Sequence, residues 1–312
     1  MTPISDRNLI EVKHEGGTDV FLGCIVATVG ILAIVWGNVM DGFIQFKTPF
    51  CITTAEMNIA LIVKGIRTPD PDIAIIGSSL SHRLDPSLFA NNNVMNLSAM
   101  GGNAMTGLEV LSSALSLPKV ILVEINILDR EVNEEWKNKG IAAAQLRPWV
   151  ILSGVSKPLR YILTPPIFSY SPPDQQAAQR SSKRTILRSQ NAATYDIQSL
   201  VSAGLVKWDQ RNSWDIANQN FKRIQELIIE FESRGAKVYL LYLPYADGYD
   251  HHASAQRNRE IASGNDTFTC QRCIDVRRLV AVEELRWKDG VHLDARSALI
   301  VAEALEKRLL PQ

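Results

Sequence analysis

Short apolar runs separated by longer segments constrain the fold of this chain more than any other feature. Each run is rich in aliphatic residues, and the first stops at Gly77-Ser78-Ser79, which is the pattern of a buried strand that breaks into a loop. Strands covered by helices on both faces of a parallel sheet have continuous apolar sequences of this kind. The predicted strands are Asp72–Ile76, Val94–Leu97, Val120–Ile125 and Val238–Leu243.

The segments between these runs have helical spacing. Asn103–Ser116 places apolar residues near a helical period, and Trp214–Arg234 carries an apolar stripe that Gly235 closes. The stripe consists of Ile216, Phe221, Ile224, Leu227, Ile228 and Phe231. Strands that alternate with helices predict an α/β fold with a mainly parallel sheet, whose active site lies beyond the carboxyl ends of the strands.

A run without charge, Val20–Met40, precedes this part of the chain. As a helix it is long enough to cross about 30 Å of hydrocarbon, and it lacks the polar face that a buried core helix usually keeps. Gly37-Asn38-Val39-Met40 offers no small-x-small cleavage site, which disfavours a cleaved signal peptide. The sequence therefore predicts one uncleaved transmembrane helix at residues 20–40.

Basic residues near this run predict its orientation. Arg7 and Lys13 precede it, whereas only Lys47 follows closely, so the positive-inside rule places residues 1–19 in the cytoplasm. We expect a single-pass protein of a bacterial inner membrane, with a linker at 41–69 and a periplasmic domain at 70–312. Disulfides are permitted in that compartment, and Cys270 and Cys273 form either a local disulfide or two unpaired thiols.

From about residue 129 to 212 the alternation of strand and helix patterns is lost, and prolines and aromatic residues are frequent. This predicts an insertion that caps or borders the site. It holds a basic cluster, for which a solvated face is favoured over a site for an anionic glycan or lipid headgroups. The cluster consists of Arg180, Lys183, Arg184 and Arg188.

The balance of charges argues against nucleic-acid binding, and the surroundings of the histidines argue against a metal site. Lys plus Arg and Asp plus Glu both number 33, and no segment shows the clustered basic face that nucleic-acid binding requires. His251 and His252 lie near Asp247 and Asp250, but their Tyr, Gly and Ala neighbours favour a polar loop over a metal site. We expect neither a metal nor a cofactor.

Two short motifs carry the chemistry. Ser79 follows the first predicted strand, and Asp289-Gly-Val-His292 precedes the predicted C-terminal helix Ala295–Leu309. A serine hydroxyl is a weak nucleophile, so it needs a histidine to take its proton and a carboxylate to hold the imidazole. Each motif has a plainer interpretation: Gly-Ser-Ser as an ordinary turn, and Asp289 as the cap of the following helix.

Together these motifs resemble the SGNH (GDSL-like) hydrolases, over about residues 70–130 and 215–310. Gly77-Ser78-Ser79-Leu80 looks like the GDS(L) block, with Ser78 in place of the usual Asp, and Asp289-Gly-Val-His292-Leu293 looks like the DxxH block. The resemblance implies a three-layer α/β sandwich and a Ser79, His292 and Asp289 triad.

The resemblance also implies an oxyanion hole. Asn96–Gly101 looks like the second block of the family and makes Gly101 a backbone donor by position. The third block lacks the usual GxND, so Asn126, two places early, is the side-chain donor we expect. His82, three residues after Ser79, is interpreted as a surface helix residue that borders the pocket at most.

An anchored domain of this layout is similar to accessory proteins that O-acetylate exopolysaccharides or D-alanylate teichoic acids. The resemblance thus implies acyl transfer to a glycan outside the membrane, with a membrane-bound O-acyltransferase or the polysaccharide synthesis and export machinery as partner. Fold and triad do not choose between water and a sugar hydroxyl as acceptor. A carbohydrate or lipid esterase (deacetylase) and a noncatalytic glycan-binding or assembly subunit remain as alternatives.

Overall fold

The structure is a computed structural model that describes residues 28–29, 54–55, 58, 61–62, 66, 71–90, 93–114, 116–145, 173–190, 197–209, 213–263 and 272–309. Residues 53–312 form one compact unit. Apart from Thr28 and Val29, the predicted transmembrane run lies outside the described residues. Within the ranges given above, no helix combines the length and the apolar character that crossing a membrane requires.

A five-stranded sheet forms the centre of this unit, in the order β2-β1-β3-β4-β5, and every neighbouring pair is parallel. The predicted α/β fold with a parallel sheet is therefore confirmed. The edge strand β5 was not predicted, because Cys273-Ile274-Asp275 holds a single aliphatic residue and lacks the apolar run that marks the other strands. The strands are β1 Ile73–Ile76, β2 Val94–Asn96, β3 Val120–Glu124, β4 Lys237–Tyr242 and β5 Cys273–Asp275.

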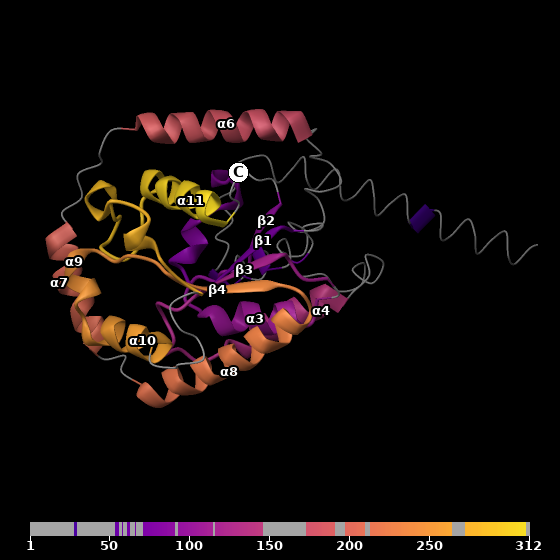
Figure 1. Ribbon diagram of the computed structural model, residues 1–312, viewed down its shortest axis with the longest axis horizontal. Helices are drawn as coiled ribbons and strands as arrows, with labels where there is room; N and C mark the ends of the chain where they lie inside the picture. The colour runs from indigo at the N-terminus through magenta and orange to yellow at the C-terminus, as the bar shows by residue number, and fades with distance from the viewer. Residues whose placement is uncertain are drawn as a thin grey trace, which may run out of the picture. The chain divides into compact units, whose positions relative to one another are not determined.

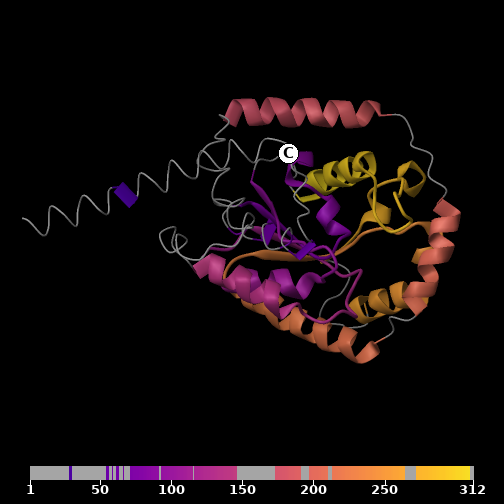
Figure 2. The same ribbon diagram turned by 180° about the vertical axis from the view of Figure 1, so that it is seen from behind.

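Helices cover both faces of the sheet. Figures 1 and 2 show α3 and α8 on one face and α11 on the other. The helices are α3 Ala104–Ser112, α4 Glu134–Gln145, α6 Pro173–Ser189, α7 Ile197–Asp209, α8 Trp214–Ser233, α9 Asp247–Asp250, α10 Ala253–Ser263 and α11 Ala295–Leu309. Short 3₁₀ turns occupy Ser81–Arg83, Pro86–Leu88, Val276–Arg278 and Val282–Glu284.

Burial explains why the strand sequences are apolar throughout. Each residue of β1 is fully buried, because helices pack against both faces of that strand. On α8 the predicted stripe from Phe221 to Phe231 faces the core. The Ser213 hydroxyl accepts a hydrogen bond from Ile216 N and so caps the start of α8, and Gly235 ends it with a φ of +93°.

The predicted insertion is helical where the structure describes it. Within residues 129–212 lie α4, α6 and α7, and α4 packs against α3. The basic cluster lies on α6, where Arg184 and Arg188 both bind Glu303 of α11. Lys183 and Arg188 are exposed, as a solvated face predicts, whereas Arg184 is largely covered and helps to hold α6 against α11.

Candidate active site

The Ser79 turn lies where the strand order reverses. The chain leaves β1 for β2 on one side and later enters β3 on the other side of β1. Ligands of open parallel sheets bind beyond the carboxyl ends of the strands at such a reversal. Ser79 is half-buried in the turn that follows β1, whereas its neighbour Ser78 is fully buried.

A tight loop before α11 brings Asp289 and His292 together. Trp287 and Leu293 form an antiparallel bridge, and Lys288 N donates to His292 O over 2.8 Å, which closes the loop. Gly290 adopts a φ of +82° at its tip, where a residue with a side chain would be strained. Asp289 Oδ1 accepts from His292 N at 2.8 Å and from Val291 N at 3.1 Å. The carboxyl group is therefore fixed by its own loop.

These two motifs meet as a hydrogen-bonded relay. Asp289 Oδ2 lies 2.7 Å from His292 Nδ1, and His292 Nε2 lies 2.8 Å from Ser79 Oγ. The structure therefore brings together the three residues predicted from the separate motifs. A neutral imidazole in this position accepts the serine proton at Nε2 while its Nδ1–H donates to the carboxylate.

Several hydrogen bonds act on the Asp289 carboxyl group. Burial by itself raises its pKa, but donors from the His292 ring, the His292 backbone and Val291 N outweigh that effect. Together they lower the pKa of Asp289 from 3.8 to about 2. The carboxylate consequently stays ionised at neutral pH.

Two backbone N–H groups on the turns after β1 and β2 have no acceptor among the described residues. In the part of the chain that the structure describes, neither Ser79 N nor Gly101 N donates to a protein acceptor. Gly101 is exposed, and its φ of +80° turns the loop after β2, as expected from its place in the sequence. These two groups come from the turns after β1 and β2, which are adjacent strands.

Side chains on both sides hold the loop that contains Gly101. Asn58 Nδ2 donates to Met100 O at 2.7 Å, and Met100 N donates to Asn58 Oδ1 at 2.8 Å. Arg130 Nη1 donates to Gly102 O at 3.1 Å. Asn58 is fully buried, although it lies in the segment interpreted as a linker. A lone Asn outside any periodic pattern gives no sequence signal for this role.

The structure gives Asn126 different partners from those that its predicted oxyanion role requires. Its Nδ2 donates to Leu243 O at 2.7 Å, and its Oδ1 accepts from Leu243 N at 2.8 Å. The amide thus ties the end of β3 to the end of β4. These contacts lend no support to an oxyanion role for Asn126, which stays a prediction.

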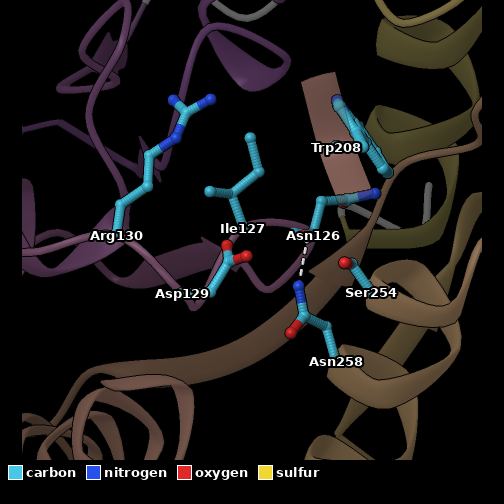
Figure 3. A pocket seen from close by; sticks show the side chains of 7 residues that line it. All are labelled: Asn126, Ile127, Asp129, Arg130, Trp208, Ser254 and Asn258. Carbon is cyan, nitrogen blue, oxygen red and sulfur yellow. Dashed lines mark hydrogen bonds between the residues drawn. The ribbon is translucent and has the colours of Figure 1, made fainter. Parts of the chain in front are cut away.

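A small cavity lies at the same place. Figure 3 shows Asn258 reaching the Asn126 carbonyl, with Trp208 and Ser254 beside them. The cavity volume is about 20 Å³, which suits a single water molecule and is too small for an acyl or sugar group. Its lining residues are Asn126, Ile127, Asp129, Arg130, Trp208, Ser254 and Asn258.

A larger groove borders the loop that carries Asp289. Its volume is about 710 Å³, and it lies between α7, the start of α9 and residues 285–287. Val201 of α7 lines the groove and also lies against Gly290, where a Cβ atom would approach it to 2.6 Å. Helix α7, which lies within residues 129–212, thus borders the loop that carries Asp289 and His292.

His82 is closer to the site than its sequence position indicated. It lies in the 3₁₀ turn after Ser79, it is half-buried, and its ring is hydrogen-bonded to the backbone of Ser98. Burial lowers its pKa below 6.5, and the charges of Arg83 and His292 act in the same direction. The interpretation of His82 as a surface helix residue is therefore wrong.

Sequence reasoning missed Glu124, which lies beneath the serine turn. It is the last residue of β3 and is 1% exposed, and its carboxyl group accepts hydrogen bonds from Ser78 and Ser81. The signal was available, because a Glu in an otherwise apolar strand run needs hydrogen-bond partners wherever it is buried.

The other residues considered in the sequence have structural partners. Asp250 accepts from Tyr242 and binds Arg259 and Arg277. Asp247–Asp250 forms α9, so the expected polar loop is partly helical. Among the residues that the structure describes, no three His, Cys, Asp or Glu side chains gather to hold a metal ion. Cys273 begins β5, whereas Cys270 lies outside the described residues, so its pairing stays a prediction.

Comparison with known proteins adds no family to this geometry, because the chain matches neither a protein-family model nor a curated protein.

Proposed function

We propose that this protein is a serine-dependent acyltransferase of SGNH type, which O-acetylates a cell-surface or secreted polysaccharide outside the cytoplasmic membrane. The observation that carries the proposal is the continuous relay from Asp289 through His292 to Ser79, with distances of 2.7 and 2.8 Å. A hydrogen-bond network that served stability alone would not need an accessible serine at its end. Ser79 is half-exposed, which favours a catalytic role.

The first half of the reaction uses the relay and the two available N–H groups. His292 Nε2 takes the hydroxyl proton as Ser79 Oγ attacks the carbonyl carbon of an acyl donor. The carbonyl π electrons move to its oxygen, and Ser79 N and Gly101 N donate to the oxyanion. The intermediate collapses, the bond to the leaving oxygen breaks, and that oxygen takes the proton from His292. The acyl group then rests on Ser79 Oγ.

The second half returns the acyl group to an acceptor. A sugar hydroxyl gives its proton to His292 Nε2 and attacks the ester carbonyl, after which Ser79 Oγ leaves and takes the proton back. Water in place of the sugar would make the protein an esterase. Acyl transfer needs an acceptor bound next to Ser79, and the groove beside residues 285–287 supplies surface for a chain-like molecule.

The expected location supports a glycan acceptor. The uncharged run 20–40 has the length and composition of an anchor, and the weak charge bias favours a periplasmic domain. We propose a membrane-bound O-acyltransferase as the partner that supplies the acyl group across the membrane. This partner follows from the resemblance to accessory proteins of glycan acetylation.

Acyl-enzyme formation and acceptor use test the proposal together. The full-length chain in detergent micelles is mixed with p-nitrophenyl acetate, and intact-protein mass spectrometry follows acetylation. Acetyl on Ser79 that transfers to an added oligosaccharide is the expected result, with Ser79→Ala as the control. Hydrolysis without transfer would assign the protein to the esterases. No acetylation of the wild-type chain, with no labelling by a fluorophosphonate, would favour the noncatalytic glycan-binding subunit.

A further inference from the structure

We propose that Glu124 is a positioning residue for this reaction: its buried carboxyl group, which comes from a different strand, sets the turn that presents the Ser79 hydroxyl and N–H. This inference rests on the proposed function and deepens it. Glu124 has no hydrogen bond to the relay itself, so it acts through the turn that contains Ser79.

The contacts of Glu124 are concentrated on one turn. Oε2 accepts from Ser78 N at 2.8 Å, from Ser81 N at 3.2 Å and from Ser81 Oγ at 2.7 Å. Oε1 accepts from Ser78 Oγ at 2.8 Å. In the described ranges of the chain, no Lys or Arg pairs with this carboxyl group. Burying a carboxyl group destabilises the folded state unless the group is hydrogen-bonded. The serine hydroxyl and backbone N–H donors of this turn offset that loss.

This arrangement selects which N–H group of the turn stays available. The N–H groups of Ser78 and Ser81 go to Glu124, and Leu80 N donates to Ser78 Oγ at 3.2 Å. Of the four N–H groups from Ser78 to Ser81, only that of Ser79 has no protein acceptor in the described structure. That is the group on which the proposed oxyanion stabilisation depends.

Strand register puts Glu124 in this place. Ile76 pairs with Val123 across β1 and β3, so the next residues, Gly77 and Glu124, lie opposite each other. A Cβ atom on Gly77 would lie 2.5 Å from Glu124 Cβ and 2.3 Å from Ser81 Oγ. Gly77 therefore leaves the space that lets the carboxyl group reach the turn.

The same contacts explain the structural role of Ser78, which stands where the GDS(L) block usually has Asp. The Ser78 hydroxyl donates to Glu124 and accepts from Leu80 N, so it connects the backbone of the turn to a carboxyl group on β3. In this chain the acidic group beside the nucleophile thus comes from the neighbouring strand.

The test compares Glu124→Gln with Leu241→Val in the full-length chain. Leu241 is fully buried on β4 and pairs in register with Glu124, so its truncation weakens the same part of the sheet without touching the serine turn. Glutamine keeps one acceptor oxygen but places an NH₂ donor against serine and amide donors. We measure kcat and KM with p-nitrophenyl acetate, the rate of fluorophosphonate labelling at Ser79, and Tm.

We expect Glu124→Gln to lower kcat and the labelling rate by about 10- to 100-fold with KM within about twofold, the loss expected when a reacting group is misplaced by an ångström. Leu241→Val should lower Tm at least as much while kcat stays within about twofold. Equal losses of kcat at equal Tm in the two variants, or an unchanged labelling rate in Glu124→Gln, would overturn the positioning role.

Ser81→Ala keeps the proposal testable if Glu124→Gln does not fold. It removes one donor to the same carboxyl group, so it should lower the labelling rate at Ser79 in the same direction, and an unchanged rate would refute the role. Failure of the proposed function gives a different result, because the wild-type chain itself would then not be labelled at Ser79.

Discussion

His292 Nε2 lies 2.8 Å from Ser79 Oγ, although 213 positions separate the two residues in the chain. The turn after β1 supplies the hydroxyl, and the loop before α11 supplies the imidazole. Since Asp289 holds the other ring nitrogen, the imidazole is fixed in both position and tautomer before any ligand binds. A preformed relay of this kind makes variants of neighbouring residues informative.

Adjacent serines should respond in different ways to substitution. Ser79→Ala should reduce p-nitrophenyl acetate hydrolysis at least about 10³-fold, because it removes the nucleophile while leaving Tm nearly unchanged. Ser78→Ala should lower Tm, since Ser78 is fully buried and donates to Glu124, and should slow fluorophosphonate labelling, although the label should still attach to Ser79. Labelling of Ser78, or none in the wild-type chain, would contradict the assignment.

The two partners of the relay should differ in their effect on activity. His292→Ala removes the base, whereas Asp289→Asn disturbs the tautomer and leaves a base in place, so Asp289→Asn should retain more kcat. Measurements of kcat with p-nitrophenyl acetate check this, and an Asp289→Asn variant as inactive as His292→Ala would contradict the separate roles of the two residues.

Gly77→Ala should disrupt the site through crowding alone. The added Cβ atom would lie 2.3 Å from Ser81 Oγ and 2.5 Å from Glu124 Cβ, both buried. Overpacking of a buried position costs about 1–3 kcal/mol of unfolding free energy. Chemical denaturation measures this loss. For comparison, Ser87→Ala alters a position near the surface and should shift stability by less than about 0.5 kcal/mol. Wild-type stability in Gly77→Ala would show that Glu124 is not seated against the turn.

His82 should make stability depend on pH. Burial lowers its pKa below 6.5, so between 6.5 and that lowered value the unfolded chain binds more protons than the folded one. Its contribution therefore weakens as the pH falls below 6.5. His82→Gln should flatten the dependence of Tm on pH just below pH 6.5. Parallel Tm curves for wild type and His82→Gln would contradict the burial of this ring.

Reporter fusions test the proposed membrane orientation of the chain. Alkaline phosphatase fused after Gln312 should be active, since it folds only where disulfides form, and a cytoplasmic reporter at the same position should be inactive. Exchanging the charge bias, by moving Arg7 and Lys13 to the far side of residues 20–40, should weaken the alkaline phosphatase signal. An inactive alkaline phosphatase fusion beside an active cytoplasmic one would reverse the topology.

The strands β1 to β4 and the pairing of Asp289 with His292 could be predicted from the sequence because their determinants are local. An apolar run bounded by a turn identifies a buried strand such as β1, and the three-residue spacing of Asp289 and His292 lets their side chains meet within one loop. By contrast, β5 was missed since it holds only one aliphatic residue, Ile274, and α6 was not foreseen because its docking depends on Glu303 of α11.

The partners of buried polar side chains were decided by the tertiary structure. Asn126 was expected at the oxyanion hole, yet it binds Leu243, 117 positions away, because the end of β4 lies beside it. Asn58 and Glu124 gained their roles in the same way, through Met100 and the Ser78 turn. The sequence by itself determined which segments become strands and which residue types carry the chemistry, since both follow from local pattern. Strand order and register determined which buried donor meets which acceptor, because a polar group withdrawn from water must bond to whatever the packing of distant segments places within about 3 Å of it.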